Sequence, residues 1–97
     1  MAEPRDSHRT RRVQIRVHGI VQGVGYRYGC RARAVSAGVA GWVRNLPDGG
    51  VEAELEGESG AVDAVVEWAR TGPSLARVTD LAVVEQRPCG DVGFEIR

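Results

Sequence analysis

The sequence contains no lysine, so all thirteen of its basic residues are arginine. Without a lysine amine, the chain can be neither a P-loop nucleotide hydrolase nor an enzyme that forms Schiff bases. Cysteine is also scarce, and Cys30 and Cys89 lie too far apart in the sequence for a zinc cluster or a redox CxxC motif. The pair could form one disulfide, but two reduced, structural thiols fit a cytosolic chain better.

Long apolar runs and a signal sequence are both missing. No apolar run approaches the length of a membrane span, and the first twelve residues are polar. We therefore expect a cytoplasmic protein without a membrane partner. We also predict a disordered tail over residues 1–11 and a single domain over residues 12–97.

The charges cancel overall but are unevenly distributed. Residues 1–33 hold eight arginines, whereas residues 48–67 hold seven acidic residues and no basic one. A basic segment of this kind could contact nucleic acid. A soluble surface with one local requirement for positive charge is the simpler interpretation, and we expect no nucleic-acid partner.

Hydrophobic periodicity predicts the elements of the first half. Apolar and polar residues alternate over residues 13–18, which indicates a half-buried strand. A glycine-rich loop follows. After it, apolar residues recur at spacings of three and four, and Gly38 is a natural stop. This spacing predicts a helix, and residues 39–45 then read as a second strand; the predicted buried face of the helix comprises Val24, Tyr28, Ala32 and Val35.

The second half shows a turn, strands and another helix. Residues 46–50, LPDGG, carry strong turn chemistry, and the following apolar residues alternate with glutamates that we expect to face solvent. A helix begins near Ser59, and a fourth strand over residues 78–86 would direct Leu81 and Val83 to the core. A short strand, GFEI, follows; the buried stripe of the helix is predicted to comprise Val62, Val65, Val66 and Ala69.

The order of elements predicts an α+β fold. Strand–helix–strand–strand–helix–strand is the split βαβ arrangement of a ferredoxin-like sandwich, with two helices on one face of an antiparallel sheet. In this topology the first two strands are parallel, and the third lies between them. Their carboxyl ends therefore share one edge of the sheet.

The glycine-rich loop, GIVQGVGYR over residues 19–27, has two possible explanations. Its glycines could simply make a tight turn, or they could let backbone N–H groups converge on an anion at a helix N-terminus. Arg27 favours the anion, because a cation in the first turn of a helix is otherwise unfavourably placed. The loop is not a dinucleotide fingerprint, since Tyr28 stands where the third glycine is required.

Asn45 is expected to lie near this loop, because it ends the second strand. Two strand spacings, roughly 10 Å, separate it from the end of the first strand. Its side chain has both a donor and an acceptor, so it could orient a water molecule. An asparagine before a turn is also commonplace. Arg44 is a rival cation, but alternation should direct it to the opposite face of the sheet.

Two motifs in this order resemble the acylphosphatase family. They are the loop sequence of residues 19–27 and GWVRN at residues 41–45, which is followed by DGGVE at residues 48–52. The likeness covers nearly everything after residue 12 and implies an acylphosphatase-like domain over residues 12–97. Tyr26 replaces the more usual phenylalanine, and Gly29 stands where the family commonly has an aromatic residue.

The resemblance implies an acylphosphatase, which hydrolyses the carboxyl–phosphate bond of small acyl phosphates to carboxylate and inorganic phosphate. Arg27 would bind the phosphate and Asn45 would orient the attacking water. No metal or cofactor is implied. The leaving carboxylate, with a pKa of about 4–5, needs no proton, so His18 is not assigned as a general acid. The main chain of six residues would complete the cradle: Val21, Gln22, Gly23, Val24, Gly25 and Tyr26.

Three other functions fit part of this pattern. Acylphosphatase-like domains also occur in hydrogenase-maturation proteins, where they act on carbamoyl phosphate. A module that binds anions or phosphoproteins would keep the loop but would not need Asn45. RNA-recognition domains share the sandwich but stack bases on aromatic residues of the sheet, and the first and third strands here lack them. We expect a monomer.

Overall fold

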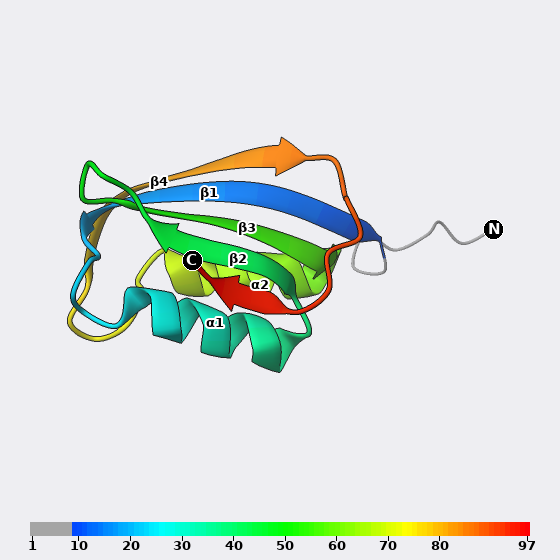
Figure 1. Cartoon of the computed structure of the whole chain (residues 1–97), viewed down its shortest axis with the longest axis horizontal. Coiled ribbons are helices and arrows are strands. Elements are labelled where there is room, and N and C mark those ends of the chain that lie inside the picture. Colours follow the sequence, from blue (N-terminus) through cyan, green and yellow to red (C-terminus); the bar gives the residue numbers. More distant parts are fainter. Residues whose placement is uncertain (1–8) are drawn as a thin grey trace.

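A computed structural model describes residues 9–97, which form a five-stranded sheet and two helices (Figure 1). Of the tail predicted over residues 1–11, residues 1–8 lie outside the described residues, and residues 10 and 11 belong to the first strand. The first strand begins two residues before the predicted start of the domain. The elements in chain order are β1 (Thr10–Ile20), α1 (Tyr26–Ala37), β2 (Ala40–Asn45), β3 (Val51–Glu58), α2 (Ser59–Ala69), β4 (Arg77–Gln86) and β5 (Phe94–Ile96).

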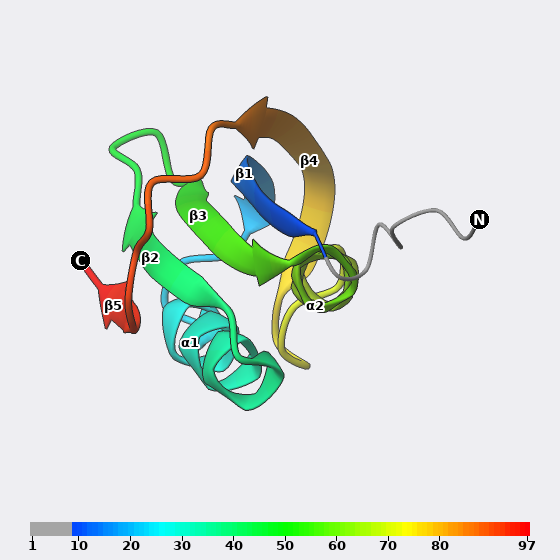
Figure 2. The ribbon, with the colours of Figure 1, turned by 90° about the vertical axis from the view of Figure 1, so that its right-hand side faces the viewer.

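The strands lie in the order β4-β1-β3-β2-β5. β3 pairs antiparallel with both β1 and β2, so β1 and β2 run parallel with β3 between them, as predicted. The sheet is nevertheless mixed, because β5 pairs parallel with β2. The chain leaves β4 at one edge and crosses to the opposite edge before β5 begins (Figure 2). The ferredoxin-like prediction is thus confirmed, and the sheet is antiparallel as predicted except for the β2–β5 pair.

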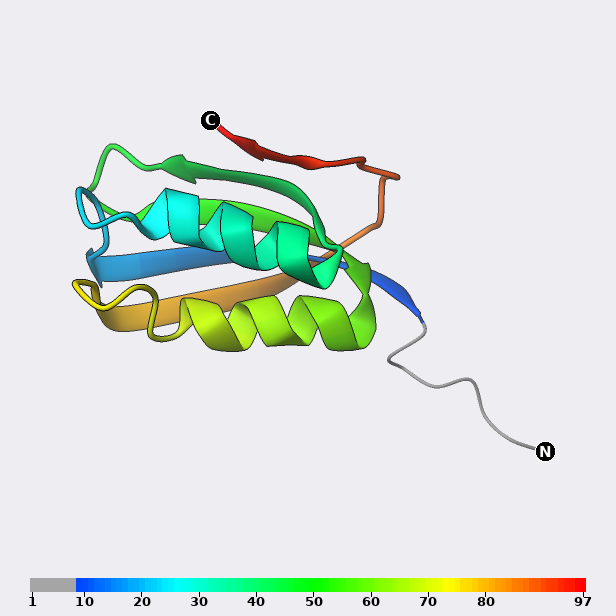
Figure 3. The same cartoon turned by 90° about the horizontal axis from the view of Figure 1, so that it is seen from below.

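The core lies between the sheet and its two helices, which cover the same face (Figures 2 and 3). The alternating apolar residues of β1 and β3 are fully buried there, and so is the predicted stripe of α2. α2 packs on β1 and β3, which leaves the outer strand β4 less covered. Leu81 is accordingly only partly buried, and Val83 is exposed rather than in the core.

The predicted buried face of α1 is wrong. Tyr28 and Val35 are exposed, and the buried residues are Tyr26, Cys30 and Ala34. Both sets recur at about four residues, so the sequence offers two overlapping helical stripes. The tertiary contacts of Tyr26 select the second stripe, as shown below.

Gly29 gives α1 a flat surface against α2. A Cβ atom at this position would lie 2.8 Å from Cζ2 of Trp68, so the indole ring occupies the space of a larger side chain. The same ring packs on Tyr26, with 5.3 Å between ring centroids and a tilt of 48°. Such an aromatic pair adds about 0.5–1.5 kcal/mol beyond area burial. An aromatic residue of α2 therefore fills the place that the resemblance assigns to one of α1.

The face of the sheet without helices, here called the open face, is covered by ion pairs. The glutamates of β3 point to this face as predicted, but they do not all reach solvent: Glu52 is 2% exposed and Glu56 is 5% exposed. The strand register places Arg16 opposite Glu52 and Arg12 opposite Glu56. The arginine side chains lie over the carboxylates, because oppositely charged residues directly across two strands attract each other.

Candidate active site

Three segments meet at the end of the sheet where β1 and β2 finish: the loop after β1, the first turn of α1 and the end of β2. They enclose a cavity of about 230 Å³, here called the loop hollow. Arg27 and Asn45, which are separated by most of α1 and all of β2, both line it. The hollow is lined by Val21, Gly23, Gly25, Tyr26, Arg27, Tyr28 and Asn45.

The loop glycines are required by backbone geometry. Gly23 and Gly25 have φ angles of 77° and 82°, in the left-handed region that favours glycine. Gly25 is the N-cap of α1, and no side chain caps the helix there. The first turn also contains no acidic residue, so the first amides of α1 have no side-chain acceptor in the described structure. These amides and the positive end of the helix dipole favour a bound anion.

Gln22 ties the loop to the turn that follows Asn45. Its Nε2 donates to the main-chain oxygens of Leu46 and Gly50, at 2.8 Å and 2.9 Å. Gln22 and Val24 do not line the hollow, unlike the other predicted cradle residues. Sequence reasoning missed the anchoring role of Gln22, because its partners are main-chain atoms 24 and 28 residues away and leave no local signal.

Tyr26 fixes the start of α1. Its ring is buried, and its hydroxyl donates to the main-chain oxygen of Ala69 at 2.7 Å. Burial raises the pKa of this phenol. The segment after α2 also lies against the ring, since a Cβ at Gly72 would come within 2.6 Å of it. Figure 3 shows this segment beside the loop after β1. The Tyr26 side chain therefore anchors the start of α1, and only its main-chain groups are available to a ligand in the hollow.

Neither the Arg27 side chain nor the Asn45 side chain is held by a strong interaction with another described residue. Arg27 Nη1 donates to an oxygen of Arg97, the last residue of the structure, at 3.3 Å, and no aspartate or glutamate side chain within residues 9–97 pairs with it. Asn45 is exposed, and its side chain forms no hydrogen bond to another residue of the described part of the chain. Most donors of the guanidinium and both groups of the carboxamide thus stay available to a ligand.

Arg44, the rival cation for phosphate binding, and His18, a possible general acid, both lie outside the hollow. Arg44 occupies the open face, as expected, where its Nη2 lies 2.7 Å from a carboxylate oxygen of Glu52. His18 Nε2 lies 3.0 Å from Oδ2 of Asp48. The Gly50 N–H and His18 lower the pKa of that aspartate. Neither Arg44 nor His18 lines the loop hollow.

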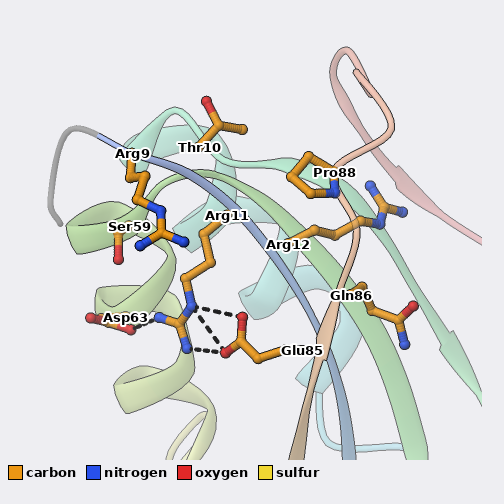
Figure 4. A pocket seen from close by; sticks show the side chains of 9 residues that line it. All are labelled: Arg9, Thr10, Arg11, Arg12, Ser59, Asp63, Glu85, Gln86 and Pro88. Atoms are coloured by element: carbon orange, nitrogen blue, oxygen red, sulfur yellow. Dashed lines mark hydrogen bonds and ion pairs between the residues drawn. The ribbon is translucent and has the colours of Figure 1, made fainter.

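Cations in a second cavity are already paired. This cavity, of about 510 Å³, lies at the start of β1 and beside the start of α2 (Figure 4). There Arg11 donates to Asp63 and also to Glu85, whose Oε2 is 2.6 Å from Nη2. The guanidinium is held by carboxylates on two sides and is less available to a ligand than Arg27.

The sequence model described as acylphosphatase matches residues 13–96. The chain belongs to the acylphosphatase family. An acylphosphatase of Rubrobacter xylanophilus (strain DSM 9941 / JCM 11954 / NBRC 16129 / PRD-1) is 52% identical over 92 residues, which are 94% of this chain and 84% of that relative. The resemblance noted in the sequence is thereby confirmed.

Solved structures support the same assignment. The crystal structure of acylphosphatase from Bacillus subtilis superposes with a TM-score of 0.86 at 40% identity, covering 90% of this chain and 98% of that one. Full-length HypF, in a phosphate- and nucleotide-bound form, superposes with a TM-score of 0.82 at 28% identity. That match covers 92% of this chain but only 12% of HypF.

Membership of the acylphosphatase family establishes the reaction. The chain is an enzyme that hydrolyses the carboxyl–phosphate bond of acyl phosphates. No helix within residues 9–97 is both long and apolar enough to cross a membrane.

Proposed function

We propose that the loop hollow is the catalytic site, in which Arg27 binds the phosphate and Asn45 orients the attacking water. The main chain of residues 21–26 would supply further donors to the phosphate oxygens. The observation that carries this proposal is the convergence on one cavity of an arginine that pairs with no aspartate or glutamate of residues 9–97, an exposed carboxamide and the uncapped start of α1.

The phosphate would be held mainly by a positive charge and by hydrogen-bond donors that point toward its oxygens. Phosphoryl transfer through a loose transition state places negative charge on the three equatorial oxygens. A guanidinium can fork onto two of these oxygens, and main-chain amides can reach the third. Because these donors are fixed before substrate binds, they stabilise the transition state without reorganisation.

The water would be positioned rather than deprotonated by Asn45. A carboxamide accepts one hydrogen bond and donates another, but it does not take a proton. The departing carboxylate is a weak base with a pKa of about 4–5, so it leaves without protonation. The proposed chemistry therefore needs no general acid from His18 and no metal or cofactor.

We also propose that the enzyme is a cytoplasmic monomer without a nucleic-acid partner. Cys30 and Cys89 are both free thiols, which fits a reducing compartment. The open face presents arginines neutralised by glutamates, so it offers little charge to a nucleic-acid backbone. The same ion pairs leave no broad apolar surface on that face for a second subunit.

Two substitutions separate binding from chemistry. Arg27→Ala is expected to lower kcat/KM for benzoyl phosphate by about 10²–10³-fold and to weaken competitive inhibition by inorganic phosphate. Asn45→Ala is expected to lower kcat by a similar factor while phosphate inhibits as before, because only the water loses its partner. Phosphate release measured by a colourimetric assay checks both, and carbamoyl phosphate serves as a second substrate.

Arg33→Ala is the matched control, since Arg33 is exposed on the same helix and does not line the hollow. Its activity should equal that of the unmodified enzyme. Full activity of a folded Arg27→Ala variant would refute the assignment of roles. A crystal soaked in phosphate should show the anion between Arg27 and the loop amides.

A further inference from the structure

We infer that Tyr28 contacts the acyl group and favours substrates whose acyl group is flat and apolar, such as an aromatic acid. This inference rests on the roles proposed for Arg27 and Asn45. Tyr28 lines the loop hollow, yet its side chain is 70% exposed and is not used in the core. A large, partly apolar side chain beside a catalytic cavity is available to a ligand.

The direction of Tyr28 follows from its neighbours on α1. Successive residues of a helix are rotated by about 100°. Tyr26 points inward to α2, where it meets Ala69. Arg27 donates to an oxygen of Arg97, directly after β5, and Arg31, one turn later, donates to the main-chain oxygen of Phe94 in β5 at 3.3 Å. A further rotation from Arg27 carries Tyr28 away from the sheet, to the outer side of the hollow.

Asn45 bounds the hollow from the opposite side, because it belongs to the sheet. In a phosphoryl transfer, the attacking and leaving oxygens lie roughly in line through phosphorus. A water held at Asn45 on the sheet side directs the leaving carboxylate away from the sheet. The acyl group then leaves the hollow on the outer side of α1, where Tyr28 lies.

The chemistry of the hollow selects the class of acyl group. Arg27 is the one charged residue among those that line it, and it is engaged by the phosphate. The lining thus offers no second cation to an acidic acyl group and no carboxylate to a basic one. The phenol ring of Tyr28 offers an apolar face, and contact between two aromatic rings improves binding by about 2- to 12-fold.

The test compares two substrates that share the phosphate and differ in the acyl group. In Tyr28→Ala, KM for benzoyl phosphate should rise by about 2- to 12-fold, while KM for acetyl phosphate stays unchanged. Competitive inhibition by inorganic phosphate should also stay unchanged. Tyr28→Phe should retain the wild-type KM for benzoyl phosphate, because it keeps the ring. Val35→Ala, at another exposed position of α1, is the matched control.

Equal changes for benzoyl and acetyl phosphate, or none for benzoyl phosphate, would overturn the inference. So would weaker phosphate inhibition in Tyr28→Ala, since Tyr28 would then shape the phosphate site instead. These outcomes are distinct from failure of the proposed roles. In that case Arg27→Ala would keep its activity, whatever the substrate preference of the Tyr28 variants.

Discussion

Arg27 in the loop hollow and Arg12 on the open face illustrate two uses of the same side chain. Arg12 is 5% exposed, and its guanidinium lies within 2.9 Å of carboxylate oxygens of Glu54, Glu56 and Asp91. Arg27 is only partly buried, and its one hydrogen bond to a described residue, at 3.3 Å, goes to an oxygen of the last residue, Arg97. One arginine is fully engaged by the protein, and the other is not.

The difference shows which arginine can act on a ligand. Removing a buried charge from its partner is strongly unfavourable, so Arg12 cannot turn to a substrate without leaving the buried Glu56 carboxylate with main-chain N–H donors but no cation. Arg27 loses little when it turns to a phosphate. In a chain without lysine, the pairing state, and not the residue type, separates a structural cation such as Arg12 from arginines, such as Arg27, that remain available to a ligand.

The largest expected effect comes from Arg12. Arg12→Ala should lower the free energy of unfolding by about 3–5 kcal/mol, because Glu56 then stays buried without its cation. Arg27→Ala should leave the free energy of unfolding nearly unchanged. Denaturant titrations of the two variants check this contrast. Equal stability losses would show that Arg27 is also a structural cation and would break the comparison.

A smaller effect is expected at Glu52. Burial alone would raise the pKa of Glu52, but its hydrogen bonds to Arg16 and Arg44 outweigh burial and hold the pKa below its ordinary value of 4.5. The folded state therefore favours the charged carboxylate. This contribution to stability is present above about pH 4.5 and is lost as the pH falls toward the lowered pKa of the folded state.

Glu52→Gln should therefore lower the free energy of unfolding at pH 7 by about 2 kcal/mol, since hydrogen bonds to a charged group are lost. The variant should then lose less stability than the unmodified protein between pH 5 and pH 3, a range set by the ordinary carboxyl pKa of 4.5. Urea titrations across this range check the sign. Parallel pH curves for the two proteins would contradict it.

The smallest effect on stability is expected at Gln22. Gln22→Ala should lower the free energy of unfolding by about 1 kcal/mol, because two neutral hydrogen bonds to the turn are lost. kcat should fall by about tenfold, because the loop is no longer held in a fixed position relative to Asn45. The attacking water is then misplaced relative to the phosphate, which slows the reaction. Gln14→Ala, which removes an amide bonded to Glu54 on the open face, is the matched control and should keep its kcat.

Much of this fold could be predicted because several patterns were unambiguous. Apolar residues alternate strictly in β1 and β3, and α2 has a single apolar stripe, so each element has one way to face the core. The joint position of the loop and Asn45 followed from topology, since parallel strands bring their carboxyl ends to one edge.

Other features depended on contacts distant in the sequence. The burial of α1 was mispredicted, because Tyr26 and Tyr28 each begin a plausible stripe and only Ala69 and Trp68 decide between them. Alternation placed Glu52 on the open face but could not show that two arginines cover it. The parallel pairing of β5 likewise depends on how the connection after β4 crosses the sheet.

The contact between Arg27 and the main chain beside β5 links residues 70 positions apart. The strand that leads into the loop, β1, is an inner strand of the sheet, paired with β3 and β4, so its position also depends on distant segments. Pairings of this kind form late and slowly, because the chain must close large loops before any contact is gained. A partly folded chain therefore has no assembled hollow. Recovery of hydrolysis during refolding would mark the moment at which the loop after β1, the start of α1 and the end of β2 come together.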